Sequence, residues 1–336
     1  MRRVGCHAPT VPFEPLGRSS MRICLMVEGQ EGVSWDEWVD LARTCEEAGL
    51  EGLFRSDHYV STIDEATLGS LDAWAVLCGL ATVTDRIRLG TMVSPATFRH
   101  PSLLAKMVVT ADHISDGRVE LGMGAGWFER EHSAYGFDFP PTGERMKILA
   151  EQLEIVRGEW SEAEFTFDGA YYSLEGLHAL PRPVQRPHPP LIIGGSGGSK
   201  SLALAARWAD EYNTLFPSVE EARARRSGLD QALGAAGRLP DEYTFSLMTT
   251  CIVGRDDAEL RRRVQDVLTR TNNNTAVDDY IAEASERHLV STTEQVIERL
   301  HRYSEAGAGR VMLQHLDHRD LDMVGLIGSE LVPALA

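Results

Sequence analysis

Apolar positions from Met21 onward alternate between short continuous runs, which are typical of buried strands, and longer segments with helical periodicity. In the first half of the chain this pattern predicts four successive strand–helix units. The expected strands cover residues 21–27, 50–55, 87–93 and 118–121, and the expected helices cover residues 35–48, 71–82, 101–114 and 145–160. Ser34 and Gly49 suit the two ends of the first helix, as an N-cap and a C-terminal glycine.

The second half continues the same alternation. We expect strands at residues 191–193, 211–215, 244–253 and 310–313, each followed by a helical pattern. Eight strand–helix units predict an α/β fold of the (β/α)8 TIM-barrel type, whose functional groups gather at the carboxyl ends of the strands.

The domain organisation follows from this reading. We expect a single domain over residues 21–336, preceded by a disordered extension of residues 1–20. Two insertions interrupt it, at about residues 161–188 and 271–291. The first contains a predicted hairpin over residues 165–174, and the second a polar helical stretch whose length suits a lid.

The net charge and the cysteine pattern indicate which classes of molecule the protein can bind. The 336 residues carry a formal net charge of -17, which opposes binding to nucleic acid or to an anionic membrane surface. No apolar run approaches the roughly 20 residues that cross a bilayer. The five cysteines form no C-x-x-C pair and have no histidine at metal-ligand spacing, which predicts free thiols, a reducing cytoplasm and no metal site. The expected partner is a small molecule.

A glycine-rich loop after the expected strand 191–193 is the clearest candidate binding site. It leads into a helical pattern and consists of Gly194, Gly195, Ser196 and Gly197. Glycines let the backbone approach a ligand closely, and the free N–H groups at a helix start can meet a phosphate. The same residues also suit an ordinary turn, and the loop alone leaves both interpretations open.

Polar side chains at other strand ends are candidates for chemistry at the barrel mouth. After the second strand, Asp57 and His58 could orient and protonate a ligand, although a capping Asp beside a solvated His fits this position equally well. Glu28 ends the first strand, where a carboxylate either binds substrate or stays solvated at the edge. Gln314 and His315 end the last strand, and we expect both to face the same mouth as substrate-side residues.

Longer stretches at these strand ends resemble the bacterial-luciferase-like flavin and deazaflavin oxidoreductases, and within them the branch that uses coenzyme F420. The resemblance extends over about residues 21–333. It rests on the combination of FRSDH at 54–58, LGTMVSP at 89–95, FRHP at 98–101 and LGMGAGW at 121–127.

The resemblance implies a homodimeric barrel that holds a deazaflavin at its mouth. His58 would act as general acid or base beside the ring, with Asp57 next to it. A non-prolyl cis peptide is implied at Met92–Val93. Some relatives carry an acid where Trp127 stands, so no acid role transfers to that position. Besides the glycine-rich loop, the implied cofactor contacts are Thr91, Met92, Val93, Gly124, Gly126 and Trp127.

The alternate glycines at 122, 124 and 126 lack the G-x-G-x-x-G spacing of a Rossmann dinucleotide site, and we exclude that interpretation. We expect them to let a planar ring approach the end of the fourth strand instead.

Three functions are compatible with these observations. The leading prediction is an F420-dependent oxidoreductase that transfers a hydride between the deazaflavin and a small organic substrate. An FMN-dependent luciferase-like monooxygenase would use the same barrel and the same phosphate loop, so the fold does not separate the two. A non-catalytic flavin-binding barrel is the third possibility, and it needs no role for His58.

Overall fold

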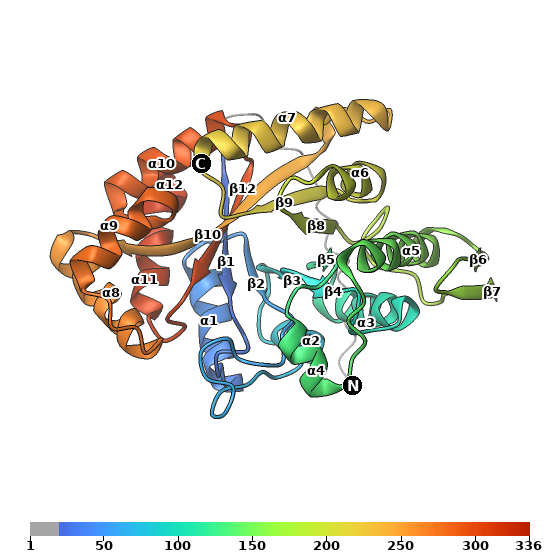
Figure 1. Ribbon diagram of the computed structural model, residues 1–336, viewed down its shortest axis with the longest axis horizontal. Helices are drawn as coiled ribbons and strands as arrows, with labels where there is room; N and C mark the ends of the chain where they lie inside the picture. Colours follow the sequence, from blue (N-terminus) through green and yellow to red (C-terminus); the bar gives the residue numbers. More distant parts are fainter. Residues whose placement is uncertain (1–19) are drawn as a thin grey trace, which may run out of the picture.

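The computed structural model describes residues 20–336, so the expected N-terminal extension lies outside the described residues except for Ser20. Eight parallel strands form a closed barrel in the order β10-β12-β1-β2-β3-β5-β8-β9, and the pairing of β9 with β10 closes it (Figure 1). The predicted (β/α)8 fold is confirmed. The barrel strands are β1 (Arg22–Val27), β2 (Gly52–Arg55), β3 (Arg88–Thr91), β5 (Val119–Gly124), β8 (Leu191–Gly195), β9 (Glu211–Leu215), β10 (Thr244–Gly254) and β12 (Arg310–His315).

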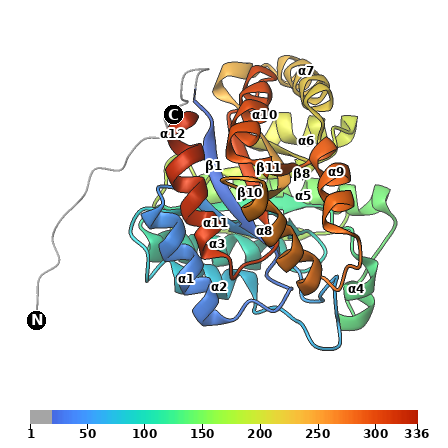
Figure 2. The same ribbon diagram turned by 90° about the vertical axis from the view of Figure 1, so that its left-hand side faces the viewer.

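Helices cover the outside of the barrel (Figures 1 and 2). The first one begins as predicted, because the Ser34 side chain accepts the backbone N–H of Glu37 and the Glu37 side chain accepts that of Ser34. The helices are α1 (Trp35–Glu47), α2 (Ala73–Leu80), α3 (Pro101–Ser115), α4 (Glu129–Tyr135), α5 (Thr142–Ser161), α6 (Ser199–Trp208), α7 (Val219–Ala235), α8 (Asp257–Arg270), α9 (Val277–Arg287), α10 (Thr293–Glu305), α11 (Leu321–Leu326) and α12 (Val332–Ala334).

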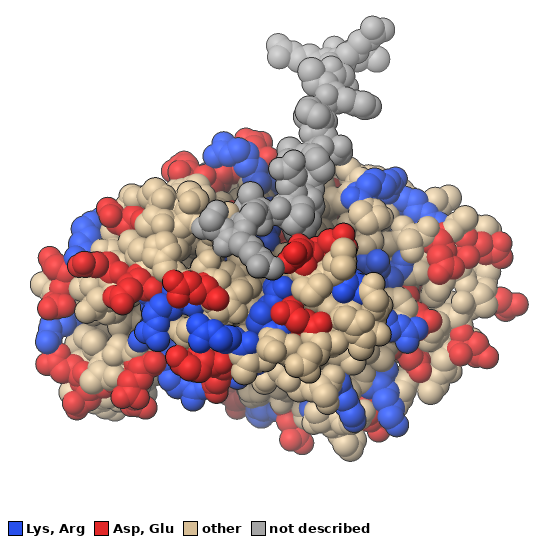
Figure 3. Space-filling view, turned by 90° about the horizontal axis from the view of Figure 1, so that it is seen from above, with Lys and Arg blue, Asp and Glu red and all other residues tan. Residues whose placement is uncertain are grey.

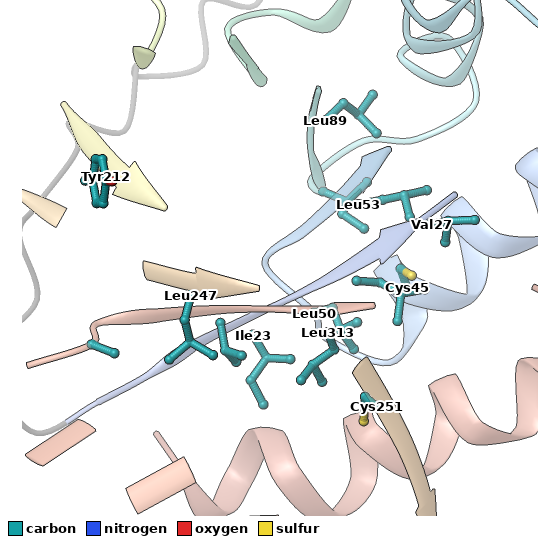
Figure 4. Close-up of a cluster of buried hydrophobic side chains, with 14 of the residues drawn as sticks. Ile23, Val27, Cys45, Leu50, Leu53, Leu89, Tyr212, Leu247, Cys251 and Leu313 are labelled. Atoms are coloured by element: carbon teal, nitrogen blue, oxygen red, sulfur yellow. The ribbon is translucent and has the colours of Figure 1, made fainter. Parts of the chain in front are cut away.

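The main hydrophobic core lies between the strands and this helical layer. Side chains alternate along each strand, so Ile23, Leu53 and Leu313 pack outward while their neighbours face the barrel axis. Figure 4 shows this cluster, with side chains from several strands close together. The predicted free thiols are confirmed for the described cysteines, whereas Cys6 lies outside the described residues. The free cysteines are Cys24, Cys45, Cys78 and Cys251.

The expected strand over residues 87–93 is interrupted in the structure. β3 ends at Thr91, and the short β4 (Ser94–Pro95) then pairs with the end of β5. The peptide bond between Met92 and Val93, inside this interruption, is cis, as the family resemblance implied. Strand periodicity did not reveal the break, because the apolar residues Met92 and Val93 continue the expected strand without a turn residue between them and Thr91.

Both insertions have more structure than the sequence pattern predicted. The hairpin consists of antiparallel β6 (Phe165–Asp168) and β7 (Ser173–Leu177), so it extends beyond the predicted end at residue 174 and projects next to α5 (Figure 1). In the second insertion, α9 matches the predicted polar helix. It leads into β11 (Leu289–Thr292), an unpredicted strand that pairs with the far end of β10.

The amino-terminal end of the barrel is closed by a buried group of ion pairs. Arg310 at the start of β12 contacts Glu120 at 2.7 Å, Glu51 at 2.9 Å and Glu211 at 3.0 Å. Burial raises the pKa of Glu120, but Arg310 and Arg88 outweigh it and hold that pKa at about 2. Burial dominates at Glu211 and raises its pKa. One guanidinium thus compensates several carboxylates in the barrel interior.

One face of the molecule carries charges of both signs. On the face in Figure 3, Lys and Arg side chains are interspersed with Asp and Glu. None of the helices in residues 20–336 is long and apolar enough to span a membrane.

Candidate active site

The carboxyl end of the barrel carries a chain of hydrogen-bonded polar side chains. Thr250 Oγ1 donates to Gln314 Oε1 at 2.8 Å, and Gln314 Nε2 donates to Glu28 Oε1 at 2.7 Å. Gln30 Nε2 donates to the other oxygen of Glu28 at 3.0 Å, and Ser56 Oγ donates to Gln30 at 2.6 Å. The structure therefore joins two of the three predicted substrate residues, Glu28 and Gln314, in one belt of hydrogen bonds that runs from β10 to the end of β2.

His58 lies beside this belt, directly after β2. Its Nδ1 is 2.7 Å from Glu131 Oε1, and the other oxygen of Glu131 accepts the backbone N–H of Tyr59 at 3.1 Å. An ionised carboxylate can only accept hydrogen bonds, so Nδ1 carries the proton. Among the described residues, Nε2 of His58 has no hydrogen-bond partner, which leaves it for a ligand.

The surroundings of His58 favour its charged form. Burial alone would lower the pKa of the imidazole. The hydrogen bond to Glu131, its charge, and the charges of Glu28 and Asp57 outweigh burial and raise this pKa. A histidine with three carboxylates around it is suited to give and take a proton near neutral pH.

Asp57 points away from the mouth, into an ion pair. Arg99 holds both of its carboxylate oxygens, at 2.6 and 3.1 Å, and Ser94 Oγ donates to it at 2.7 Å. The Asp57 side chain is only 1% exposed. The structure therefore gives Asp57 a role in fixing the β2 end against β4, and not the expected place beside a ligand.

His315 does not share the mouth with Gln314, contrary to our expectation. Adjacent strand residues point to opposite sides, so His315 follows the outward-facing Leu313 toward the helices. Both of its ring nitrogens are buried without a hydrogen-bond partner. Burial lowers the pKa of His315 to about 4, despite nearby Asp320 and Asp317.

Val93 fills the space that the alternate glycines provide. A Cβ on Gly122, Gly124 or Gly194 would lie 3.0, 2.7 or 3.2 Å from Val93 methyl carbons. The β5 glycines thus accommodate the side chain after the cis peptide, where we expected a planar ring. Gly126 has a φ of +78° and lies close to Thr97, so it serves the chain turn into α4.

The glycine-rich loop connects β8 to α6 as predicted. Gly197 has a φ of +84° and donates its N–H to the Tyr212 hydroxyl at 2.8 Å. Gly198 precedes the first residue of α6, and no side chain caps the helix start. The N–H groups of the first turn are therefore suited to an anion, and Lys200 adds a positive charge there.

Two stacked aromatic rings form a wall next to His58. Trp127 and Phe128 have ring centroids 5.1 Å apart, and the Trp127 ring meets the His58 ring edge-on at 5.5 Å. Trp127 is 65% exposed, which is unusual for so large an apolar side chain. This position suits contact with a ligand in the mouth.

Residues 20–324 match the family described as luciferase-like monooxygenase. The chain belongs to this family. It is 28% identical over 321 residues to the F420-dependent glucose-6-phosphate dehydrogenase of Microbacterium testaceum, a match that covers 89% of this chain and 93% of that protein. It is 27% identical over 212 residues to the FMNH2-dependent dimethylsulfone monooxygenase of Pseudomonas putida, covering 62% and 57%.

Two further proteins are similar to this chain, one in sequence over about half of its length and one in structure over nearly all of it. An uncharacterized protein of Mycobacterium tuberculosis is 38% identical over 157 residues, and the match covers 47% of this chain and 54%, about half, of that relative. The crystal structure of monooxygenase RslO1 from Streptomyces bottropensis superimposes with a TM-score of 0.80 and 25% identity, covering 94% of this chain and 100% of that one. The named relatives of this luciferase-like protein thus include both an F420-dependent and an FMNH2-dependent enzyme.

Sequence reasoning assigned no role to several groups of this luciferase-like site. The sequence pattern assigned Glu131 no role, because its partner His58 lies 73 positions earlier in the chain. Thr250 and Gln30 were missed because a single Thr or Gln at a strand end carries no distinctive signal. Among the described residues, no group of three or more His, Cys, Asp or Glu side chains is arranged to hold a metal ion.

Proposed function

We propose that this enzyme transfers a hydride between coenzyme F420 and a small organic substrate while His58 exchanges the accompanying proton. The observation that carries the proposal is the placement of His58 at the mouth, with Nδ1 held by Glu131 and Nε2 free of protein partners. In oxidation, a substrate C–H carbon would give the hydride and the attached heteroatom would give its proton to Nε2; in reduction, the same carbon would take the hydride and the heteroatom would take the proton from Nε2. The polar belt of Glu28 and Gln314 would bind the substrate's other polar groups.

The described residues fit a phosphorylated deazaflavin. The uncapped start of α6 and the glycine-rich loop would hold the phosphate, and the segment Thr91–Val93 together with Trp127 would border the ring. When bound, F420 supplies a carbon centre that accepts or donates a hydride and does not activate oxygen. The protein contributes orientation and the movement of the proton at His58.

An FMN-dependent monooxygenase is the second candidate, because the relative from Pseudomonas putida carries that activity in its name. F420 is favoured for two reasons. The F420-dependent relative aligns over 93% of its own length, against 57% for the FMN-dependent one. The motifs around Asp57 and Met92 also resemble the F420 branch.

The deciding experiment is a matched titration of the purified protein with F420 and with FMN, followed by fluorescence or calorimetry at one salt concentration. We expect micromolar binding of F420 and much weaker binding of FMN. The reverse preference would overturn the F420 assignment in favour of the monooxygenase. Tight F420 binding with no turnover in a broad screen of alcohols, aldehydes and enones would instead favour a non-catalytic carrier.

We also propose that the enzyme is a homodimer that pairs through α2 and α3. Helix α2 has the sequence AWAVLCGL, without a single charged residue, although Ala75 is exposed. On α3, Leu103 is 55% and Ile114 43% exposed. A helix that is apolar all round is normally covered, and a second copy can cover this face symmetrically. Sedimentation of Leu103→Glu, which we expect to be monomeric, tests the interface.

A further inference from the structure

Both carboxylate oxygens of Glu131 contact the segment that carries His58, one at the ring and one at the next backbone N–H. We propose that Glu131 is the positioning residue of His58: it fixes the ring orientation and the tautomer, so that Nε2 faces the mouth. The inference rests on the proposed function only in assuming that His58 moves the proton. It concerns this chain's own residues and can be tested without any cofactor.

Glu131 holds two successive residues with its two oxygens. Oε1 lies 2.7 Å from Nδ1 of His58, and Oε2 accepts the N–H of Tyr59 at 3.1 Å. The side chain is 1% exposed, so water does not compete for these hydrogen bonds. Because both oxygens are engaged, the carboxylate cannot rotate without losing a contact to the segment that carries His58.

The helix that carries Glu131 is itself fixed by buried contacts. The neighbouring His132 is fully buried, with Nδ1 2.7 Å from the Phe128 carbonyl and Nε2 2.6 Å from Thr97 Oγ1. These contacts tie the start of α4 to the segment after β4. Such outer support is what a positioning residue needs, since a mobile carboxylate would not select one ring orientation.

Tyr59 supplies a second anchor for the same arrangement. Its ring stacks on Phe98 with centroids 5.2 Å apart and lies 5.1 Å from the Tyr135 ring at the end of α4. The backbone N–H of Tyr59 is therefore held opposite Glu131 from the β2 side. The two strand ends, β2 and β5, meet through this carboxylate.

The charges that face His58 also set the expected pH behaviour. They are Glu131, Glu28 and Asp57, of which Asp57 is compensated by Arg99. Glu131 alone hydrogen-bonds the ring, and together with Glu28 and Asp57 it raises the pKa of His58 against the effect of burial. Removing its charge should lower that pKa, whereas removing a remote carboxylate should not.

The test compares Glu131→Gln with Glu65→Gln. Glu65 is an exposed carboxylate outside α4 that forms an ion pair with Arg130, a residue of the helix that carries Glu131. Its variant therefore controls for the loss of a negative charge next to α4. For Glu131→Gln we expect kcat to fall about 10- to 100-fold with KM within about threefold. We also expect the pKa of His58, followed by NMR of the ring in the cofactor-free protein, to decrease. For Glu65→Gln we expect neither change.

An unchanged His58 titration in folded Glu131→Gln would overturn the proposal, whatever the activity. Loss of kcat with an unchanged His58 pKa would likewise leave only a structural role. If Glu131→Gln fails to fold, Glu131→Asp decides, since it keeps the charge but is too short to hold both partners. We expect Glu131→Asp to lower kcat while the pKa of His58 stays raised. A wild-type kcat in this variant would refute the proposal that Glu131 positions His58. Failure of the F420 titration leaves the NMR result intact, so the two proposals are separable.

Discussion

The two ends of the barrel interior use charge in opposite ways. At the amino end, Arg310 lies within 3.0 Å of Glu51, Glu120 and Glu211, and every charged group has a partner inside the protein. At the carboxyl end, Glu28 and His58 follow β1 and β2, and Nε2 of His58 has no hydrogen-bond partner among the described residues. The ion pairs at the amino end are thus complete within the protein, whereas the polar groups at the carboxyl end keep hydrogen-bonding capacity for a ligand.

This difference separates stability from function. Buried charges are tolerated only when they are compensated, so the amino end contributes to folding and offers nothing to a ligand. The carboxyl end keeps a proton-exchanging group and hydrogen-bonding capacity for a ligand that completes it. The general layout of barrel enzymes has the same asymmetry.

The largest expected effect comes from breaking the closed end. Among the described residues, Arg310 is the guanidinium that links Glu120 and Glu211, and Arg310→Met removes it, so that Glu120 keeps Arg88 and Glu211 loses its ion pair with Arg310. We expect this substitution to lower the free energy of unfolding by about 3–5 kcal/mol, measured by denaturant titration. Adding Glu120→Gln and Glu211→Gln should recover part of the loss. No recovery would mean that the arginine acts through packing and not through charge.

A substitution at the carboxyl end of the barrel should lower turnover and leave the free energy of unfolding unchanged. His58→Ala removes the proposed proton carrier, so we expect turnover to fall about a hundredfold or more while F420 affinity stays within a few fold. The measurement is steady-state kinetics together with a cofactor titration. Wild-type turnover in this variant would eliminate the role of His58 and favour a different proton carrier.

His315 sharpens the contrast between inward and outward positions at the open end. Its pKa of about 4 lies below that of an unfolded histidine, so between about pH 6.5 and 4 only the unfolded chain binds the proton. Stability should therefore decrease as the pH falls through this window, by about 1–3 kcal/mol from this group. His315→Leu should weaken that dependence in thermal unfolding curves.

Two controls make the His315 measurement specific. His318 also has a pKa lowered to about 4 by burial and Arg270, so the dependence should be reduced and not abolished. The exposed His301 on α10 provides a matched variant, His301→Gln, which should leave the curve unchanged. Parallel wild-type and His315→Leu curves would contradict the assignment.

The smallest predicted change concerns the phosphate loop. Gly198 has a φ of -66°, and a Cβ there would come no closer than 3.9 Å to another side chain, so Asp fits as a helix cap. Its carboxylate would occupy the first-turn N–H groups, and we expect Gly198→Asp to weaken F420 binding about tenfold at unchanged thermal stability. Gly198→Asn, which caps without charge, should weaken it less. Unchanged affinity in both would place the anion site elsewhere.

Gly198 is a better site for this test than a glycine of the loop itself. A Cβ on Gly195 would lie 2.5 Å from the Tyr212 hydroxyl, which also receives the Gly197 N–H. A substitution at Gly195 would therefore distort the loop as well as add charge. The sequence showed that the loop is rich in glycine but not which of its positions has room for a side chain.

The order of strands and helices was readable from the sequence because it depends on local periodicity. Eight apolar runs, each followed by a helical pattern, specify a barrel, and the barrel places Glu28, His58 and Gln314 at one end. The direction of His315 was predicted wrongly, because residues 311–313 are all apolar and their sequence does not show which of Gln314 and His315 faces the mouth. The motifs added the family and the cis peptide at Met92–Val93.

Which polar groups meet was decided only by the tertiary structure. Glu131 reaches His58, and Arg99 takes Asp57 away from the mouth, across 73 and 42 positions of the chain. Val93 fills the glycine space of β5 that we had expected a ligand to use. The physical reason is that periodicity fixes the face on which a side chain lies. Hydrogen bonding and burial in the mouth then depend on how the loops after β2, β4 and β5 pack against one another.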